Sequence, residues 1–413
     1  MTPHRQAARL DASSVLRPRG SNHVGMRQFN ERVVLQAIRL NTSLPKAELA
    51  RLTGLTAQTI GLITTRLVED QLIIKQPAVR GRIGQPSIPL ALNPDGAFSI
   101  GIKIGRRSAD WLLVDFTGQV RERLCMDYEF PDAQTLLPAI EHHMNTMRGA
   151  LGPLHDRLVG VGVAAPFQLG GWHRMLGLSD SQSEDWNQID LRAQVQTMTD
   201  APVTFAKDTS AACIAELVAG RGRDLKNFLY LFVDTFVGGG LVINSHLHGG
   251  LHGNAGAVAS LPLGLAAVGD AAMPSPDQLI SHASLWELEQ RFIGRGLDPH
   301  AAYDERVLTA AFANETHVWI AQAANALAHA VVSGSAFLDI DAVVIDGSFS
   351  RALQAQLIAA TQQALKRYNW EGLWNTNVIA GKVGPDARAL GGALMPLHAN
   401  FAPDQDLFLK TGA

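Results

Sequence analysis

From Phe98 onward the sequence alternates predicted strands with predicted helices, and it does so in two similar rounds. In the first round, apolar runs predict strands at Phe98–Ile104, Asp110–Asp115 and Val120–Tyr128, a helix near 133–149, a strand at Leu158–Ala164, a helix near 188–198 and a strand at Val203–Ala206. The second round predicts strands at Phe228–Val233 and Gly240–Asn244, a helix near 318–336, a strand at Ala342–Ile345, a helix at 351–367, a strand at Asn377–Ala380 and a helix at 385–397. Two such halves predict an α/β body of two lobes with a ligand-binding cleft between them.

Residues 1–90 differ from this body in charge. They hold 13 Lys and Arg against 5 Asp and Glu, whereas the rest of the chain holds 22 against 33. A basic segment ahead of an acidic body predicts contact with a polyanion. Residues 1–22 are rich in Arg, Ser and Pro without a period and predict a mobile basic arm. Pro94-Asp95-Gly96 marks the boundary between a small domain at 23–92 and the body at 93–413.

The stretch AELARLTGLTAQTIGLITTRLVEDQLI, residues 47–73, predicts two helices joined by a glycine turn. Gly54 supplies the turn and Thr56 is placed to cap the second of these helices. A further amphipathic helix at 30–40 precedes them. In the last helix the apolar residues must face inward, namely Ile60, Ile63, Leu67 and Val68. The outward positions are Thr56, Ala57, Gln58, Thr59, Leu62, Thr65 and Arg66.

This order of helices is that of a helix-turn-helix, whose second helix lies in the major groove of DNA. Strands at Leu72–Lys75 and Ser87–Leu92 would flank the basic tip at 80–86 and make it a wing. Gln58 suits adenine, and Arg82 suits a narrow minor groove. The predicted DNA-binding side chains are Thr56, Gln58, Thr59, Arg66, Lys75, Arg80 and Arg82. The alternative is a helical hairpin used for dimerisation.

A winged helix-turn-helix followed by a body that begins FSIGIKIGRRSADWLLVDFTGQV resembles the ROK family (repressors, open reading frames, kinases). The resemblance extends from about Gly20 to Phe401, and it is carried best by GSNHVGMRQFNERVVLQAI, GRIGQP, VGGGLVIN, GGLHGNAGAV, VVIDGSFS and ALGGALMPL. It implies a two-lobed actin-like, ribonuclease-H-like body of the kind found in sugar kinases. It also implies a homodimer or a dimer of dimers, a palindromic operator in double-stranded DNA, and a sugar or sugar-phosphate effector.

The two hairpins that approach ATP phosphates in the family's kinases are altered here. The pattern D-x-G-x-T is replaced by Lys103-Ile104-Gly105-Arg106-Arg107, and G-T-G is replaced by Asp234-Thr235-Phe236. A carboxylate and a bulky ring in the second hairpin would repel and block a phosphate. We therefore expect no phosphoryl transfer, no catalytic residue and no nucleotide cofactor.

The sugar-binding and zinc-binding patterns are altered as well. The pattern N-D-x-N aligns with residues 207–210, and only Asp208 is kept; it would accept a ligand hydroxyl or cap the following helix. The pattern G-x-A-G-E-x-G-H aligns with 253–260 without its Glu and His. The cysteine segment is absent, so no metal is expected. The residues predicted to bind an effector are Gly170, Gly171, Lys207, Asp208, Asn254, Gly256 and Ser260. Lys103 and Lys207 would favour an anionic ligand if they face the cleft.

Together these features predict a DNA-binding transcriptional regulator, a repressor, whose body dimerises and binds an effector. With two distant cysteines and no long uncharged run, we expect a cytoplasmic protein that does not enter a membrane. Two alternatives stay open. One is a regulator whose body no longer senses a sugar and serves as a scaffold or binds a protein, and the other is a sugar kinase that gained a head. The helices near 318–336 and 351–367 are candidates for a dimer interface or for the core.

Overall fold

The computed structural model describes residues 23–78, 87–167, 186, 188–265 and 275–403. These residues form two compact units, and each is described by itself. The first unit combines the described part of Met1–Ala97 with Asp115–Thr117 and the segment from Leu397 onward. The second unit comprises Phe98–Val114 and Gly118–Pro396. Among the described residues, no helix has the length and apolar character needed to cross a bilayer.

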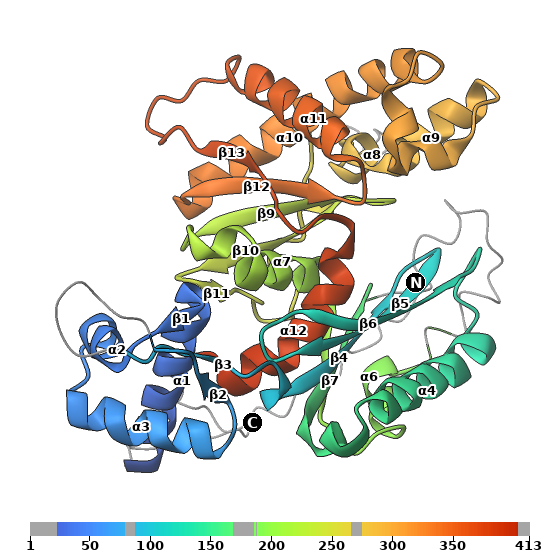
Figure 1. Ribbon diagram of the computed structural model, residues 1–413. Helices are drawn as coiled ribbons and strands as arrows, with labels where there is room; N and C mark the ends of the chain where they lie inside the picture. The colour runs from blue at the N-terminus through green and yellow to red at the C-terminus, as the bar shows by residue number, and fades with distance from the viewer. Residues whose placement is uncertain (1–22, 79–86, 168–185, 187, 266–274, 404–413) are drawn as a thin grey trace, which may run out of the picture. The chain divides into compact units, whose positions relative to one another are not determined.

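The first unit contains three helices and a small antiparallel sheet (Figure 1). The helices are α1 (His23–Asn41), α2 (Lys46–Thr53) and α3 (Ala57–Glu69), and the strands are β1 (Ser43–Leu44), β2 (Ile73–Lys75) and β3 (Leu90–Leu92). The sheet order is β1-β3-β2, with Ile73 opposite Leu92. The predicted pairing of two strands after the third helix is confirmed, whereas β1 was not predicted because two residues carry no readable alternation.

Apolar spacing and two local signals explain the helices of the first unit. Ile38, Leu49 and Ile60, one from each helix, are completely buried, and the three helices pack against one another. Gly54 ends α2 with a φ of 69°, in the left-handed region where a side chain is strained. Thr56 caps α3, since its hydroxyl accepts from the Thr59 amide at 3.2 Å. The glycine turn and the cap were both predicted, and both are confirmed.

The second unit consists of two lobes, each built on a five-stranded mixed sheet (Figure 1). The first lobe holds β4 (Phe98–Ile104), β5 (Ser108–Asp115), β6 (Val120–Asp127), β7 (Leu158–Ala165) and β8 (Val203–Lys207). The second lobe holds β9 (Phe228–Val233), β10 (Gly238–Ile243), β11 (His246–Leu247), β12 (Ala342–Gly347) and β13 (Asn377–Ala380). The sheet orders are β6-β5-β4-β7-β8 and β11-β10-β9-β12-β13, so the strands follow the same order in both lobes. The prediction of two similar halves is confirmed.

The helices of the second unit cover these sheets. They are α4 (Ala133–Ala150), α6 (Leu191–Gln196), α7 (Asp208–Ala219), α8 (Ile280–Ala283), α9 (Leu285–Gly294), α10 (Ala313–Leu338), α11 (Arg351–Leu365) and α12 (Ala387–Phe401). The five with predicted ranges, α4, α6, α10, α11 and α12, lie within a few residues of those ranges. Helices α10 and α11 pack together, and residues such as Trp319, Leu327 and Leu353 are buried in the core of the second lobe. Most of their apolar surface therefore belongs to the core, and a dimer interface on them stays a prediction.

Glycine allows α12 to approach helix α7 and strand β7 very closely. A Cβ added to Gly391 would lie 1.7 Å from the carbonyl oxygen of Ala211, which belongs to α7. A Cβ on Gly162 of β7 would lie 1.9 Å from the carbonyl oxygen of Gly392. Both distances are far below van der Waals contact, so the ALGGAL segment is a packing surface in which backbone touches backbone.

Candidate functional site

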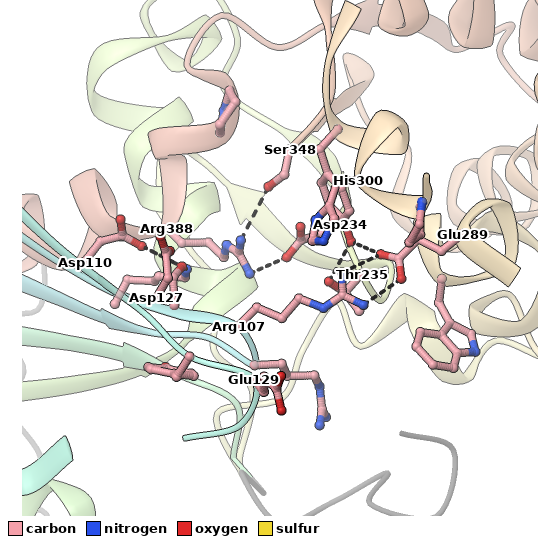
Figure 2. A pocket seen from close by; sticks show the side chains of 18 of the residues that line it. Arg107, Asp110, Asp127, Glu129, Asp234, Thr235, Glu289, His300, Ser348 and Arg388 are labelled. Atoms are coloured by element: carbon pink, nitrogen blue, oxygen red, sulfur yellow. Dashed lines mark hydrogen bonds and ion pairs between the residues drawn. The ribbon is translucent and has the colours of Figure 1, made fainter. Parts of the chain in front are cut away.

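A cavity with a volume of about 1110 Å³ opens between the two lobes of the second unit (Figure 2). One wall is the turn between β4 and β5 together with residues 127–129 at the end of β6. The opposite wall is formed by α9 and by η5 (Pro299–Tyr303), a short 3-10 helix. Asp234, Thr235, Ser348, Pro385, Asp386 and Arg388 complete the lining, and Asp386 is paired with Arg123 of β6. The two altered phosphate hairpins thus meet at one cavity, as the sequence predicts for a cleft between lobes.

One ion pair crosses the cavity from lobe to lobe. The Arg107 guanidinium donates to both carboxylate oxygens of Glu289 on α9, over 3.1 Å from Nη1 to Oε1 and 2.7 Å from Nη2 to Oε2. The Glu289 side chain is only 1% exposed, whereas that of Arg107 is 37% exposed. Burial works to lower the pKa of Arg107, but the Glu289 carboxylate more than offsets it and the pKa lies above its usual value. Such a bidentate pair between a guanidinium and a carboxylate has a fixed geometry.

Two hydroxyl groups extend this pair into the second lobe. The Tyr303 hydroxyl donates to Oε1 of Glu289, and it lies 2.9 Å from the Thr235 hydroxyl. Burial raises the pKa of Tyr303 well above its usual value, so this phenol remains a neutral donor. Glu289 is therefore satisfied from two sides, by a cation of the first lobe and by a phenol of the second lobe.

A second cluster lies around the buried guanidinium of Arg388, at the start of α12. Arg388 forms an ion pair with Asp234, lies 3.8 Å from the Asp208 carboxylate, and donates to the Ser348 hydroxyl over 3.4 Å. Its guanidinium carbon also lies 5.4 Å from the centre of the Phe232 ring. Asp234, which replaces a glycine of the family's kinases, is thus bound to a cation of the protein itself.

Lys103, which replaces the kinase carboxylate, is buried and paired rather than directed to solvent. Its ammonium donates to Asp110 over 2.9 Å and to the Ser108 hydroxyl over 2.6 Å. Burial lowers the pKa of Lys103, the nearby Arg388 lowers it further, and Asp110 works against both. Because Asp110 already neutralises it, Lys103 gives the cavity no spare positive charge for an anionic ligand.

Arg106 lies in the turn between β4 and β5 and lines the same cavity. Its guanidinium carbon lies 4.9 Å from the centre of the Phe236 ring. Burial lowers the pKa of Arg106 to about 10, while Asp208 and Asp234 work to raise it. At neutral pH this guanidinium is charged.

None of the described residues predicted to bind an effector lines the cavity, although Asp208 contacts Arg388 of the lining. The Lys207 ammonium donates to the Asn254 side chain over 3.2 Å. Asp208 is the first residue of α7 and accepts from the Thr209 amide at 2.8 Å, while Lys207 holds the capping position. Gly256 has a φ of 76°, and a Cβ there would lie 2.8 Å from the backbone of Gly240, so a structural reason for this glycine exists.

Three of the residues predicted to bind an effector remain to be placed. Ser260 is exposed. Gly170 and Gly171 lie outside the described residues. No group of three His, Cys, Asp or Glu side chains that could hold a metal occurs in the described parts of the chain.

Among the predicted DNA-binding residues of α3, some are exposed, and others already have a partner within the first unit. Gln58 is exposed, and Leu62 is 59% exposed. The hydroxyls of Thr56 and Thr59 lie 2.9 Å apart and satisfy each other. Arg66 forms an ion pair with Glu31 over 3.3 Å.

The other basic candidates of the first unit lie beyond α3. Lys75 at the end of β2 is exposed. Arg80 and Arg82 lie outside the described residues. Arg51 on α2, a further basic residue of this unit, is paired with Glu48 on its own helix.

Sequence reasoning missed Glu289 and Arg388, although a signal existed for the first of them. Leu285, Leu288 and Phe292 recur at helical spacing, and they predict α9. Glu289 falls on the same apolar face, and a carboxylate placed there requires a partner. The identity of that partner could not be read, because Arg107 is 182 residues away.

Residues 99–398 match the ROK family. The xylose repressor of Bacillus spizizenii is 25% identical over 234 residues, which are 56% of this chain and 59% of the repressor. The DNA-binding transcriptional repressor Mlc of Escherichia coli is 24% identical over 230 residues, 54% of this chain and 55% of Mlc. The chain thus spans less than two thirds of the length of either repressor.

A solved structure supports the same relationship at the level of the fold. A ROK family transcriptional regulator, a homologue of the E. coli MLC protein, superposes with a TM-score of 0.67 at 19% identity. The superposition covers 91% of this chain and 97% of the regulator. Since the family match extends over most of the sequence and the two-lobed fold agrees with it, the chain belongs to the ROK family.

Proposed function

We propose that this protein is a DNA-binding transcriptional regulator, a repressor, in which the first unit acts as a winged helix-turn-helix. The observation that carries the proposal is the surface of α3. Helix α3 buries Ile60, Ile63 and Leu67 against the rest of the unit and leaves Gln58 and Leu62 exposed near its N-terminal end. Base edges in the major groove are read by side chains of this kind, an amide for adenine and an apolar group for the thymine methyl.

The small sheet next to α3 suits contact with the DNA backbone. Strands β2 and β3 pair in antiparallel register, with Lys75 opposite Leu90, and the segment between them carries Arg80 and Arg82. A basic hairpin beside a recognition helix is the arrangement of a wing, and its cations would neutralise phosphates. Relatives named xylose repressor and DNA-binding repressor support the same function.

The body of this regulator would bind a ligand without phosphorylating it. The carboxylate of the first kinase hairpin is replaced by Lys103, which is paired with Asp110, and the second hairpin carries Asp234, which is paired with Arg388. Phosphoryl transfer needs room for the phosphates and their metal beside a base for the substrate hydroxyl. These substitutions remove that room, although the aspartate at the base position, Asp208, is kept. We infer that a sugar effector changes DNA affinity by binding two conformations of a dimeric body unequally.

Two substitutions in the first unit test the proposed DNA contacts. Lys75→Ala should weaken binding to every DNA fragment and reduce the slope of log affinity against log salt by about 1, because one phosphate contact is lost. Gln58→Ala should instead relax base preference at one position of each half-site and leave the salt slope unchanged. Fluorescence anisotropy on a fragment selected by the wild-type protein and on random DNA measures both quantities.

Unchanged DNA binding by both variants would contradict the proposal. If both variants bind selected and random DNA as the wild type does, neither side chain contacts DNA. The exposed residue Glu69, at the C-terminal end of α3, offers a control position, since Glu69→Gln changes charge on the same helix beyond the expected base contacts.

A further inference from the structure

We propose that the carboxylates of Asp234 and Glu289 determine which ligands the cavity accepts. They fill the anion positions beside Arg388 and Arg107, so the cavity excludes phosphorylated ligands and is left to uncharged polar molecules, unphosphorylated sugars among them. The inference deepens the proposed function of the body and rests on it for its biological meaning.

Glu289 is held in a fixed geometry beside Arg107. Its two oxygens accept one hydrogen bond each from the Arg107 guanidinium, as two oxygens of a phosphate would. The carboxylate is 1% exposed and also accepts from Tyr303, so it has no route to solvent. A phosphate that took Arg107 would leave this buried carboxylate without its cation, which is strongly unfavourable.

Positive and negative side chains around the cavity floor balance one another. Lys103 is paired with Asp110, and Arg388 is paired with Asp234 and lies near Asp208. With Arg106 and Arg107 there are four cations, and Asp110, Asp208, Asp234 and Glu289 match them one for one. A group of charges that is already neutral offers no net attraction to a multiply charged anion.

The walls of the cavity strengthen this selection. The carboxylates of Asp127 and Glu129 line it on the first lobe and are exposed (Figure 2). They add negative charge where a ligand would enter. The facing wall carries Trp286, Pro299 and Tyr303, whose ring surfaces suit the apolar faces of a sugar. The volume of about 1110 Å³ is sufficient for a small saccharide.

Inorganic pyrophosphate, added without metal and followed by isothermal titration calorimetry, is the probe that tests this inference. We expect the wild-type full-length protein to show no binding at the cavity. Glu289→Gln keeps the size of the side chain but removes its charge, which frees Arg107, and should bind pyrophosphate at least tenfold more tightly than the wild type. The double variant Arg107→Gln/Glu289→Gln restores neutrality and should lose that gain.

Glu287→Gln is the matched control, because it changes the same charge on the same helix at a residue outside the cavity lining. The basic first unit is identical in the wild type and in the three variants. Any pyrophosphate that it binds therefore contributes equally to all four proteins. If Glu289→Gln gains no more affinity than Glu287→Gln, the inference is wrong. It is also wrong if the double variant keeps the gain.

A second variant, at Asp234, keeps the inference testable if Glu289→Gln does not fold. Asp234→Asn removes the nearer of the two carboxylates beside Arg388 and should also gain pyrophosphate binding. Circular dichroism confirms that each variant is folded. DNA binding does not enter this experiment. A protein that binds no DNA but shows the pyrophosphate pattern would overturn the proposed function alone, and one that binds DNA without the pattern would overturn the inference alone.

Discussion

At the scale of single residues, the substitutions in the kinase motifs were readable from the sequence, but their partners were not. Lys103, Arg107 and Asp234 stand at motif positions and could be named in advance. Asp110 lies only seven residues from Lys103, whereas Glu289 and Arg388 are distant from the side chains they neutralise. Ion pairs between lobes depend on how the lobes pack, and no local pattern encodes that packing.

This pairing changes the interpretation of the basic residues in the cleft. Lysine and arginine in the first hairpin favour an anionic ligand when the sequence is considered alone. In the structure each lies beside a carboxylate, at 2.9 Å for Lys103 and 2.7 Å for Arg107. Charge at a site therefore has to be counted after the buried acids are placed.

Asp110→Asn tests how much the buried pair with Lys103 contributes to stability. The variant leaves a buried ammonium without its anion, and we expect the free energy of unfolding at pH 7 to fall by about 3–5 kcal/mol. All seven tryptophans lie between residues 111 and 374, so urea unfolding followed by tryptophan fluorescence reports on the body. A loss below about 1 kcal/mol would show that water reaches this pair as it reaches a surface ion pair.

The same variant predicts a dependence on pH. Burial works to raise the pKa of Asp110, but Lys103 outweighs it and holds the pKa below the usual value of 3.8. A carboxylate with a lowered folded-state pKa contributes stability above its unfolded pKa and loses it as pH falls through the folded value. The difference between wild type and Asp110→Asn should therefore be constant from neutral pH to about 4 and shrink below it.

At the scale of helices and strands, the prediction from sequence was accurate where apolar runs are long. β4 and β9 were predicted with their observed bounds, and α4 was predicted to within one residue, because continuous apolar strands and amphipathic helices are strong patterns. β1 and β11, with two residues each, were missed. Helix α9 was also missed, and with it the wall of the cavity that supplies Glu289.

Gly391→Ala tests the close packing of α12. Its new methyl group would overlap the backbone of Ala211, which cannot move as a flexible side chain does. We expect the free energy of unfolding to fall by about 1–3 kcal/mol or more, since overpacking forces backbone shifts. Thermal unfolding followed by tryptophan fluorescence measures the effect.

Gly149 provides the matched control for that measurement. It lies near the end of helix α4, and a Cβ there would meet nothing within 4 Å. Gly149→Ala should leave stability unchanged or raise it by up to about 1 kcal/mol, because alanine favours the helix. If both variants behave alike, the close contact of α12 with α7 is not rigid.

At the scale of the whole molecule, the division into a small basic head and a two-lobed body was predictable because charge and pattern both change near residue 94. The repeated order of strands predicted two lobes, and both sheets show it. The sequence predicted a cleft between the two lobes but not the residues that line it. Alignment to the family motifs identifies the positions that bind sugar in the family's kinases. The residues that line the cavity are different ones, because the cavity lies beside the altered phosphate hairpins.

As a whole, the molecule is proposed to select specific DNA and to respond to a sugar. The most direct measurement is selection of fragments from a genomic DNA library by the purified full-length protein, with and without a pool of unphosphorylated sugars, followed by sequencing. The account predicts enrichment of palindromic fragments that the pool reduces. Enrichment that no sugar changes would contradict the sensing role and favour a scaffold body. No selective enrichment at all would contradict the regulator itself.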